Sequence, residues 1–128
     1  PYKTTRYCFM KLDRDISILT HIVDYCDQIK ATIERFGEDR TVFASDAIYR
    51  NAVALCILQI GELVGKLSED FRTNHAAIPW RKIKAMRNIV AHSYGTVDAE
   101  VTWEIITEDI PVLKSYCSQM IGESNTTE

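Results

Sequence analysis

The residues best suited to chemistry lie together in one short segment, residues 87–95, with the sequence RNIVAHSYG. It contains Arg87, His92 and Tyr94, and the polar residue Asn88 follows the arginine. A histidine can take the proton from a 2′-hydroxyl of RNA or give one to the leaving 5′ oxygen. An arginine can brace the phosphorus, because its planar donors match the non-bridging oxygens. An Arg and a His without a carboxylate cluster therefore suit cleavage of RNA without a metal ion.

The spacing within this segment restricts how a single copy of the chain can use it. On a helix, Asn88 and His92 share a face, whereas Arg87 and His92 project about 140° apart. Tyr94 would project about 200° from His92. We therefore expect the helix to end there and Gly95 to redirect the chain. Two such helix ends facing each other across a two-fold axis would bring two Arg and two His into one groove, as in a homodimer.

The same residues also have a purely structural interpretation. Arg87 can pair with an acid of a neighbouring helix, and His92 can interact with the dipole at the helix end. Tyr94 can pack against Trp103. Spacing alone leaves both interpretations open.

Charge is distributed unevenly along the chain. The 128 residues include 15 Lys and Arg against 18 Asp and Glu, a net charge of −3, whereas nucleic-acid binders usually have a basic balance. Residues 71–97, however, contain five basic side chains and no Asp or Glu, a local charge of +5, and the other 101 residues carry −8. We interpret this basic segment as a strip that faces phosphates, and we assign RNA contact to Arg81, Lys82 and Lys84.

Composition and motifs argue against several other classes of protein. The chain is 46% hydrophobic and 26% charged, as expected for one globular domain. Its four cysteines are widely spaced, which is typical of buried thiols in a reducing cytoplasm rather than of disulfides or a zinc site. The longest apolar run, residues 52–58, is shorter than the ~20 residues of a membrane span. The cysteines and the short apolar runs lead us to expect a cytoplasmic chain. The sequence has no His-x-x-x-His pair and no Gly-rich phosphate loop, so we expect no metal or cofactor.

Helices must position the segment, because apolar residues recur with helical periodicity and no stretch alternates with period two. We predict a first helix over residues 13–36, which Gly37 ends. A second helix over about residues 45–67 follows, with Ser45 or Thr41 as its N-cap. This second helix is apolar on most sides, so it is expected to be central in a bundle or covered by a second subunit.

The second half of the chain completes the predicted bundle. Gly61 and Gly65 have the spacing typical of close helix packing, and a loop leads to a third helix from about residue 79 to residue 92 or 93. Asp98 is the expected N-cap of a fourth helix that runs toward residue 120 and is kinked or divided at Pro111. The predicted fold class is therefore an all-α bundle of four to five helices.

Several stretches together resemble the HepT-like toxins of the HEPN superfamily. RNIVAHSYG is similar to the family's Arg-x(4)-His-x-Tyr motif, and three longer stretches fall in the family's order and spacing. These are DAIYRNAVALCILQIGELVGKLS, IPWRKIKAMRNIVAH and TWEIITEDIPVLK. The resemblance covers residues 12–120 and implies a HEPN domain over residues 12–121, with an N-terminal extension over 1–11 and a flexible C-terminal tail over 122–128.

The family resemblance also implies a function. It implies a homodimer, with higher assembly left open, that acts as a metal-independent endoribonuclease toxin against RNA. Arg87 and His92 match the family's catalytic pair, and Asn88 matches a polar position that could orient the histidine or the phosphate. Tyr94 matches the tyrosine that the partner, a minimal nucleotidyltransferase antitoxin, modifies with AMP.

Three further residues, Arg50, Asn51 and Glu62, fall in positions shared with the family. Both a role in the site and hydrogen bonding between helices are open for them, and we favour hydrogen bonding between helices. An alternative from a different class stays open: a catalytically silent HEPN module that binds a nucleotidyltransferase partner or RNA.

Overall fold

The computed structural model describes the backbone of residues 2–92 and 99–126, and the side chains of residues 12–91 and 99–124 within these ranges. The described elements are, in order, α1 (Tyr2–Phe36), α2 (Arg40–Ser45), α3 (Ala47–Lys66), α4 (Glu69–Asn74), α5 (Trp80–His92), α6 (Ala99–Glu104), a π-helical turn η1 (Ile105–Asp109) and α7 (Ile110–Thr126). All of these elements are helical, which confirms the predicted all-α class.

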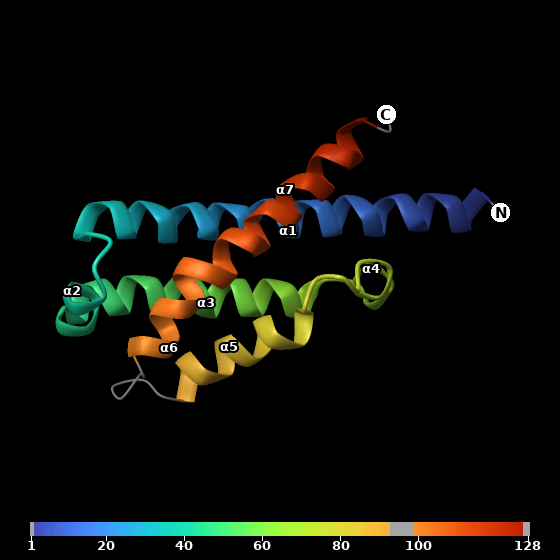
Figure 1. The fold of residues 1–128 in the computed structure, drawn as a ribbon. Coiled ribbons are helices and arrows are strands. Elements are labelled where there is room, and N and C mark those ends of the chain that lie inside the picture. The colour runs from blue at the N-terminus through green and yellow to red at the C-terminus, as the bar shows by residue number, and fades with distance from the viewer. Residues whose placement is uncertain (1, 93–98, 127–128) are drawn as a thin grey trace.

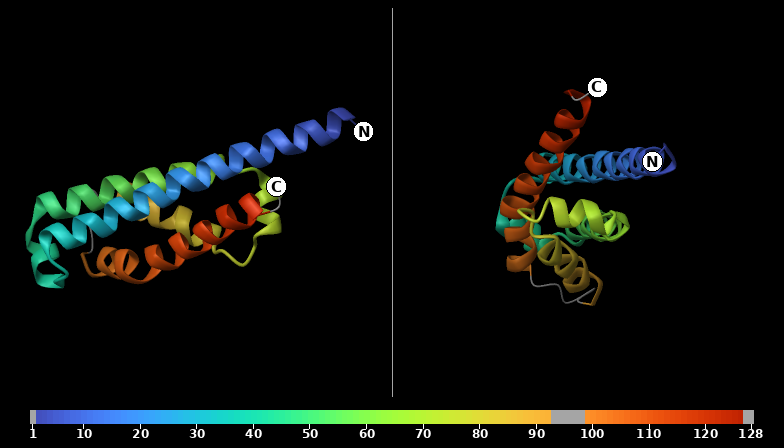
Figure 2. Two further views of the ribbon diagram at one scale, coloured as in Figure 1. Left: turned by 90° about the horizontal axis from the view of Figure 1, so that it is seen from above. Right: turned by 90° about the vertical axis from the view of Figure 1, so that its right-hand side faces the viewer.

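The long helices form one bundle with α3 at its centre. Figure 1 shows α1 and α3 lying antiparallel, with α5 along the other side of α3 and α7 crossing α1. The two ends of the chain lie at the same end of the bundle, and the first turns of α1 project beyond the other helices (Figure 2). The helix predicted to begin at residue 13 therefore begins at Tyr2, so the backbone of the predicted N-terminal extension continues α1.

Helical periodicity explains which side chains enter the core. On α1, Leu19, Ile22, Cys26 and Ile29 recur every three or four residues and are almost fully buried. Side chains with this spacing share one face of a helix, so α1 presents a continuous apolar stripe to the rest of the bundle. On α3 the buried residues cover more than one face, because α1 and α5 pack on different sides of it.

The helix α3 is apolar enough to be compared with a membrane-spanning helix. By length and composition α3 is able to cross a membrane, with a mean hydropathy of 1.4 over its most apolar window, of which 44% is buried in the bundle. A central helix of a bundle has the same composition, since it must bury side chains on several sides. Packing against α1 and α5 accounts for the buried apolar side chains of α3, whereas Ile48 and Leu55 of the same helix are exposed.

Side-chain caps set the helix boundaries between α1 and α3. Gly37 ends α1 with a φ of 112°, a conformation that glycine adopts without steric cost. Asp39 caps α2, and Asp46 caps α3 by accepting hydrogen bonds from the amides of residues 48 and 49 at 2.9 and 3.2 Å. The prediction of Ser45 or Thr41 as this cap was wrong, because both residues belong to α2, a short helix that the sequence analysis did not anticipate.

The predicted division at Pro111 is not found, because the backbone is helical without a break from Ala99 to Thr126, but the helix type changes next to this proline. The last regular turn before it is the π-helical η1, in which the amide of Ile110 donates to the carbonyl of Ile105. Pro111 follows as the second residue of α7 and has no amide hydrogen to donate. The predicted cap of this last helical segment, Asp98, lies outside the described residues.

Candidate functional site

Arg87 lies where α5 and α3 come closest. A Cβ atom added to Gly61 of α3 would lie 2.3 Å from Cβ and 2.5 Å from Cγ of Arg87. Real carbon contacts are about 3.5–4.0 Å, so only glycine allows the stem of Arg87 to cross α3 at this height. The predicted packing role is thus confirmed for Gly61 but not for Gly65, whose added Cβ would have no atom within 4 Å.

The guanidinium of Arg87 is held from two sides. Its Nη2 lies 2.6 Å from Oε1 of Glu62, and its Nη1 donates to Oδ1 of Asn88 at 3.2 Å. The Arg87 and Glu62 side chains are 37% and 53% exposed, so the ion pair remains accessible to solvent and is expected to contribute less than about 1 kcal/mol to folding. Nε of Arg87 is buried and has no hydrogen-bond partner among the described residues.

These contacts decide part of the structural interpretation. Arg87 does pair with an acid of a neighbouring helix, as that interpretation required. The partner, Glu62, was noted from the sequence only as a shared family position for which helix–helix hydrogen bonding was expected. Because the pair is solvent-accessible and weak, it fixes the direction of the guanidinium without removing the cation from reach of an incoming anion.

The structure describes only part of the predicted catalytic constellation. His92 is the last residue of α5, as predicted, but its side chain lies outside the described residues, as does all of Tyr94. The continuous helix from Trp80 to His92 confirms the geometry used above, so Asn88 and His92 lie four residues apart on one face. The hydrogen bond from Arg87 to Asn88 connects the arginine to a residue of that face.

The predicted RNA-contacting residues are all exposed on α5, but they do not all have the same surroundings. At 100° per residue, Arg81 and Lys84 project within about 60° of each other and on the same side as Asn88, whereas Lys82 projects about 100° away from Arg81. Lys82 forms an ion pair with Asp109 of η1 at 3.1 Å. Two of the three cations therefore share a face with the polar residue beside Arg87.

The two remaining positions shared with the family differ in their surroundings. Arg50 donates to the main-chain carbonyls of Phe43 and Ala44, which ties α3 to α2 and confirms the expected role in helix packing. Asn51 is exposed on α3.

The described cysteines do not provide a nucleophile. Cys26, Cys56 and Cys117 are free and buried. Burial raises the pKa of the Cys26 and Cys117 thiols to about 12, and it also raises that of Cys56. Thiols with such pKa values are protonated and unreactive near neutral pH. Within residues 12–91 and 99–124, no group of three His, Cys, Asp or Glu side chains is placed to hold a metal ion.

Comparison with known proteins gives matches to ribonucleases. Residues 22–120 match the family model described as ribonuclease HepT-like. A protein named as a probable ribonuclease HepT from Thermococcus cleftensis is 33% identical over 96 residues, which cover 71% of this chain and 87% of that protein. A candidate RNase of Caldanaerobacter subterraneus subsp. tengcongensis is 32% identical over 104 residues, 80% of this chain and 90% of the relative.

A longer relative comes from Methanocaldococcus jannaschii and is named as a gamma-glutamylcyclotransferase and candidate RNase. It is 33% identical over 113 residues, which cover 86% of this chain but only 49% of the relative, so the chain spans about half of that protein's length. No solved structure matches the chain.

Proposed function

Because this chain belongs to the HepT-like ribonuclease family, we propose that it is the toxin of a toxin–antitoxin pair of the HepT and minimal nucleotidyltransferase type. In this proposal it is a metal-independent endoribonuclease that cleaves RNA with Arg87 and His92 in a composite dimer cleft. The antitoxin silences it by modifying Tyr94 with AMP. The protein acts in the cytoplasm.

The observation that carries the proposal is the way Arg87 is held. Its stem lies against bare backbone at Gly61, and its guanidinium is directed by Glu62 and Asn88 while remaining 37% exposed. An arginine fixed in direction but open to solvent is suited to bind a phosphate. The ion pair with Glu62 opposes RNA binding only weakly, because half-exposed pairs of this kind contribute less than about 1 kcal/mol.

The proposed reaction uses one histidine from each subunit. His92 takes the proton of the 2′-hydroxyl, the 2′ oxygen attacks the phosphorus, and the bond from phosphorus to the 5′ oxygen breaks. His92 of the partner subunit gives a proton to the leaving 5′ oxygen. The products are then a 2′,3′-cyclic phosphate end and a 5′-hydroxyl end. Arg87 stabilises the charge on the pentacoordinate phosphorus, and losing a donor of this kind costs on the order of 10²–10³ in rate.

The test is cleavage of single-stranded RNA in the presence of EDTA. The wild-type chain is expected to cut, and Arg87→Ala and His92→Ala are expected to lose at least about 100-fold in rate while retaining the helical circular dichroism spectrum. Arg35→Ala is the matched control, because Arg35 is an exposed arginine in the last turn of α1 and lies outside the site. Equal cleavage by wild type and Arg87→Ala would refute the assignment.

The outer face of α3 supports the proposed dimer. Ile48 and Leu55 are 70% and 58% exposed and lie seven residues apart, so they share a face on which Glu62 also lies another seven residues along. A two-fold contact through this face would bury both apolar side chains and include Glu62, the partner of Arg87, on the same face. Leu55→Glu is expected to give monomers by light scattering and to reduce cleavage. A monomeric variant as active as wild type would exclude a composite cleft.

The basic face of α5 supports RNA contact. Each phosphate contact to single-stranded RNA contributes about 0.7 to the slope of log affinity against log salt concentration. Lys84→Ala is therefore expected to reduce that slope by about 0.7. Lys82→Ala is expected to reduce it less, because Asp109 already binds the ammonium group of Lys82. Equal changes of the slope in the two variants would show that Lys82 and Lys84 contact RNA phosphates to the same extent.

The proposed regulation has a simple electrostatic basis. A phosphodiester-linked AMP on Tyr94 would add bulk and one negative charge close in sequence to Arg87 and His92. At ~4 Å and an effective dielectric constant of ~20, such an opposite-charge pair is worth about 4 kcal/mol before desolvation, enough to compete with an RNA phosphate. Mass spectrometry of the chain expressed with and without its antitoxin is expected to show an AMP-sized addition on the Tyr94 peptide only with the antitoxin. A Tyr94→Phe variant that the antitoxin still modifies and silences would refute this.

A second function is favoured by the same ion pair. If the role of Arg87 is to join α5 to α3 through Glu62, the chain is a catalytically silent HEPN module that binds the nucleotidyltransferase partner or RNA. Absence of cleavage of any RNA, with Arg87→Ala no less inhibitory to growth than wild type, would favour this alternative.

A further inference from the structure

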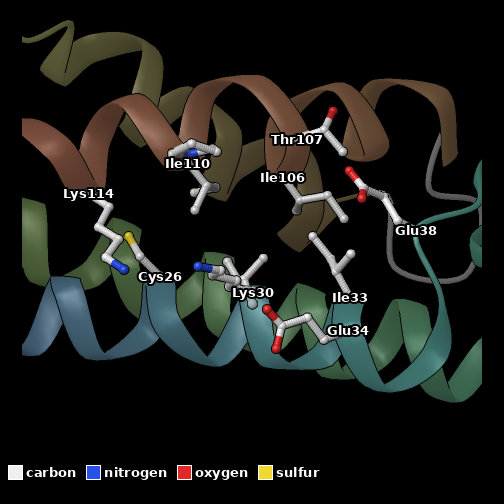
Figure 3. Close-up of a pocket in the computed structure, with 11 residues that line it drawn as sticks. Cys26, Lys30, Ile33, Glu34, Glu38, Ile106, Thr107, Ile110 and Lys114 are labelled. Atoms are coloured by element: carbon white, nitrogen blue, oxygen red, sulfur yellow. The ribbon is translucent and has the colours of Figure 1, made fainter.

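A cavity of about 330 Å³ lies on the side of the bundle formed by α1 and α7, and it has no lining residue from α5 (Figure 3). Its floor is apolar and almost completely buried, formed by Cys26, Ile29, Ile106 and Ile110. A volume of this size is at the lower end of the range found for small-molecule sites. The cavity is therefore large enough for a short organic molecule and independent of the site around Arg87.

The wall contributed by η1 and α7 contains an unusual backbone. The amide of Ile110 donates to Ile105 rather than to Ile106, and the next residue, Pro111, has no amide hydrogen. The carbonyl of Ile106 therefore lacks its regular helical donor, in a residue that lines the cavity. The hydroxyl of Thr107, also in this wall, donates to the carbonyl of Trp103 and so retains only its acceptor lone pairs for other partners. π-Helical turns occur frequently at functional sites.

Charged side chains line the cavity, and a carboxylate lies at the end away from the lysines. Figure 3 shows the ammonium groups of Lys30 and Lys114 toward the Cys26 end and the carboxylate of Glu38 toward the Thr107 end, whereas the carboxylate of Glu34 lies at the edge of the cavity beside Lys30. Lys114 is bound by Asp27 outside the cavity, which raises the pKa of Lys114.

Lys30 has no ion pair with any carboxylate of the described side chains. A Lys followed four residues later by a Glu, as in Lys30 and Glu34, is the weaker of the two orders for pairing along a helix. One end of the cavity therefore offers the ammonium of Lys30, and the other offers the carboxylate of Glu38 together with the acceptors of the η1 wall.

We propose that this cavity binds a small dipolar organic molecule of the ω-amino acid type, with a short aliphatic chain between a carboxylate and an ammonium group. Lys30 binds the carboxylate, the isoleucine floor contacts the chain, and Glu38 binds the ammonium. A purely anionic amphiphile would meet the Glu38 carboxylate at the far end, and a purely cationic one would meet Lys30, so charge complementarity selects the dipolar molecule. Cys26 contributes apolar contact only, because its thiol stays protonated.

The test uses the full chain and three six-carbon probes: 6-aminohexanoate, hexanoate and hexylamine. Amide chemical shifts in nuclear magnetic resonance spectra are expected to move for residues around the cavity, such as Ile33 and Thr107, when 6-aminohexanoate is added. The other two probes lose one charge-assisted hydrogen bond each and are expected to bind at least about tenfold more weakly. Absence of shifts with millimolar 6-aminohexanoate, or equal binding of the three probes, would overturn the proposal.

Charge variants at exposed positions make the test specific. Lys30→Met is expected to weaken binding of 6-aminohexanoate and hexanoate but not of hexylamine. Glu38→Gln is expected to weaken binding of 6-aminohexanoate and hexylamine but not of hexanoate. Lys66→Met, which removes an exposed lysine at the end of α3, is the matched control and should change none of these affinities. Loss of all binding in the control, or none in Lys30→Met, would also refute the assignment. RNA cleavage should be unchanged in every variant, so these results and those for Arg87 are independent.

Discussion

The contact between Gly61 and Arg87 can be tested by adding one methyl group. In Gly61→Ala the new Cβ would lie 2.3 Å from Cβ and 2.5 Å from Cγ of Arg87. Neither of those atoms is the far end of a flexible side chain, so a rotamer change cannot relieve the overlap at Cβ. To restore an ordinary carbon contact of about 3.5 Å, α3 and α5 must move apart by about 1 Å at this point.

The expected magnitude is the difference between two opposing effects. Adding a methyl group to a well-packed contact costs about 1–3 kcal/mol, whereas replacing Gly by Ala in a helix interior gains about 1 kcal/mol. Since rigid atoms meet at Gly61, we expect the upper part of the cost and a net destabilisation of about 1–2 kcal/mol. A displacement of about 1 Å also misplaces the guanidinium relative to Glu62, and errors of this size can cost about 10²-fold in rate.

Urea unfolding followed by circular dichroism measures the stability change, and RNA cleavage measures the change in rate. Gly65→Ala is the matched control, because Gly65 is in the same helix and its new Cβ would have no atom within 4 Å; it is expected to be neutral or stabilising by up to about 1 kcal/mol. In an Arg87→Gly background the cost of Gly61→Ala should largely disappear. The reasoning would be wrong if Gly61→Ala were as stable as Gly65→Ala.

Other contacts lead to further predictions. Asp46→Ala should lower the free energy of unfolding by about 0.5–2 kcal/mol through loss of the α3 cap, whereas Asp46→Asn should retain most of it, as urea unfolding can show. Glu62→Gln should change stability by less than about 1 kcal/mol and should tighten RNA binding in a filter assay, because it removes a negative charge beside Arg87; weaker binding would instead show that Glu62 positions the arginine for RNA. The folded-state pKa of Cys26 and Cys117 is raised from 9.0 to about 12. Their protonated thiols therefore stabilise the fold below pH 9. This contribution, on the order of a few kcal/mol, is lost as the pH rises from 9 toward 12. A Cys26→Ala, Cys117→Ala variant should show a flatter dependence of the urea midpoint on alkaline pH.

The long helices could be predicted because their apolar spacing is local information. Periodicity placed the body of α1 and α3, and Pro79 and Gly37 marked boundaries that the structure retains within one or two residues. The short helices α2 and α4 were not predicted, because six residues are too few to show a helical period. The cap of α3 was misplaced for a related reason: Ser45 and Asp46 are both good capping residues, and only the hydrogen bonds to the following amides distinguish them.

At the site, the sequence by itself determined the residue types and their spacing along one helix. Arg87, Asn88 and His92 follow from the motif, and their relative directions follow from 3.6 residues per turn. What only the tertiary structure decided is which atoms meet across helices. Gly61 and Gly65 are equivalent in sequence, yet only Gly61 contacts Arg87, and Glu62 becomes the partner of that arginine 25 residues away. These contacts depend on the height and rotation at which α5 crosses α3, which the packing of both helices sets and no local pattern encodes.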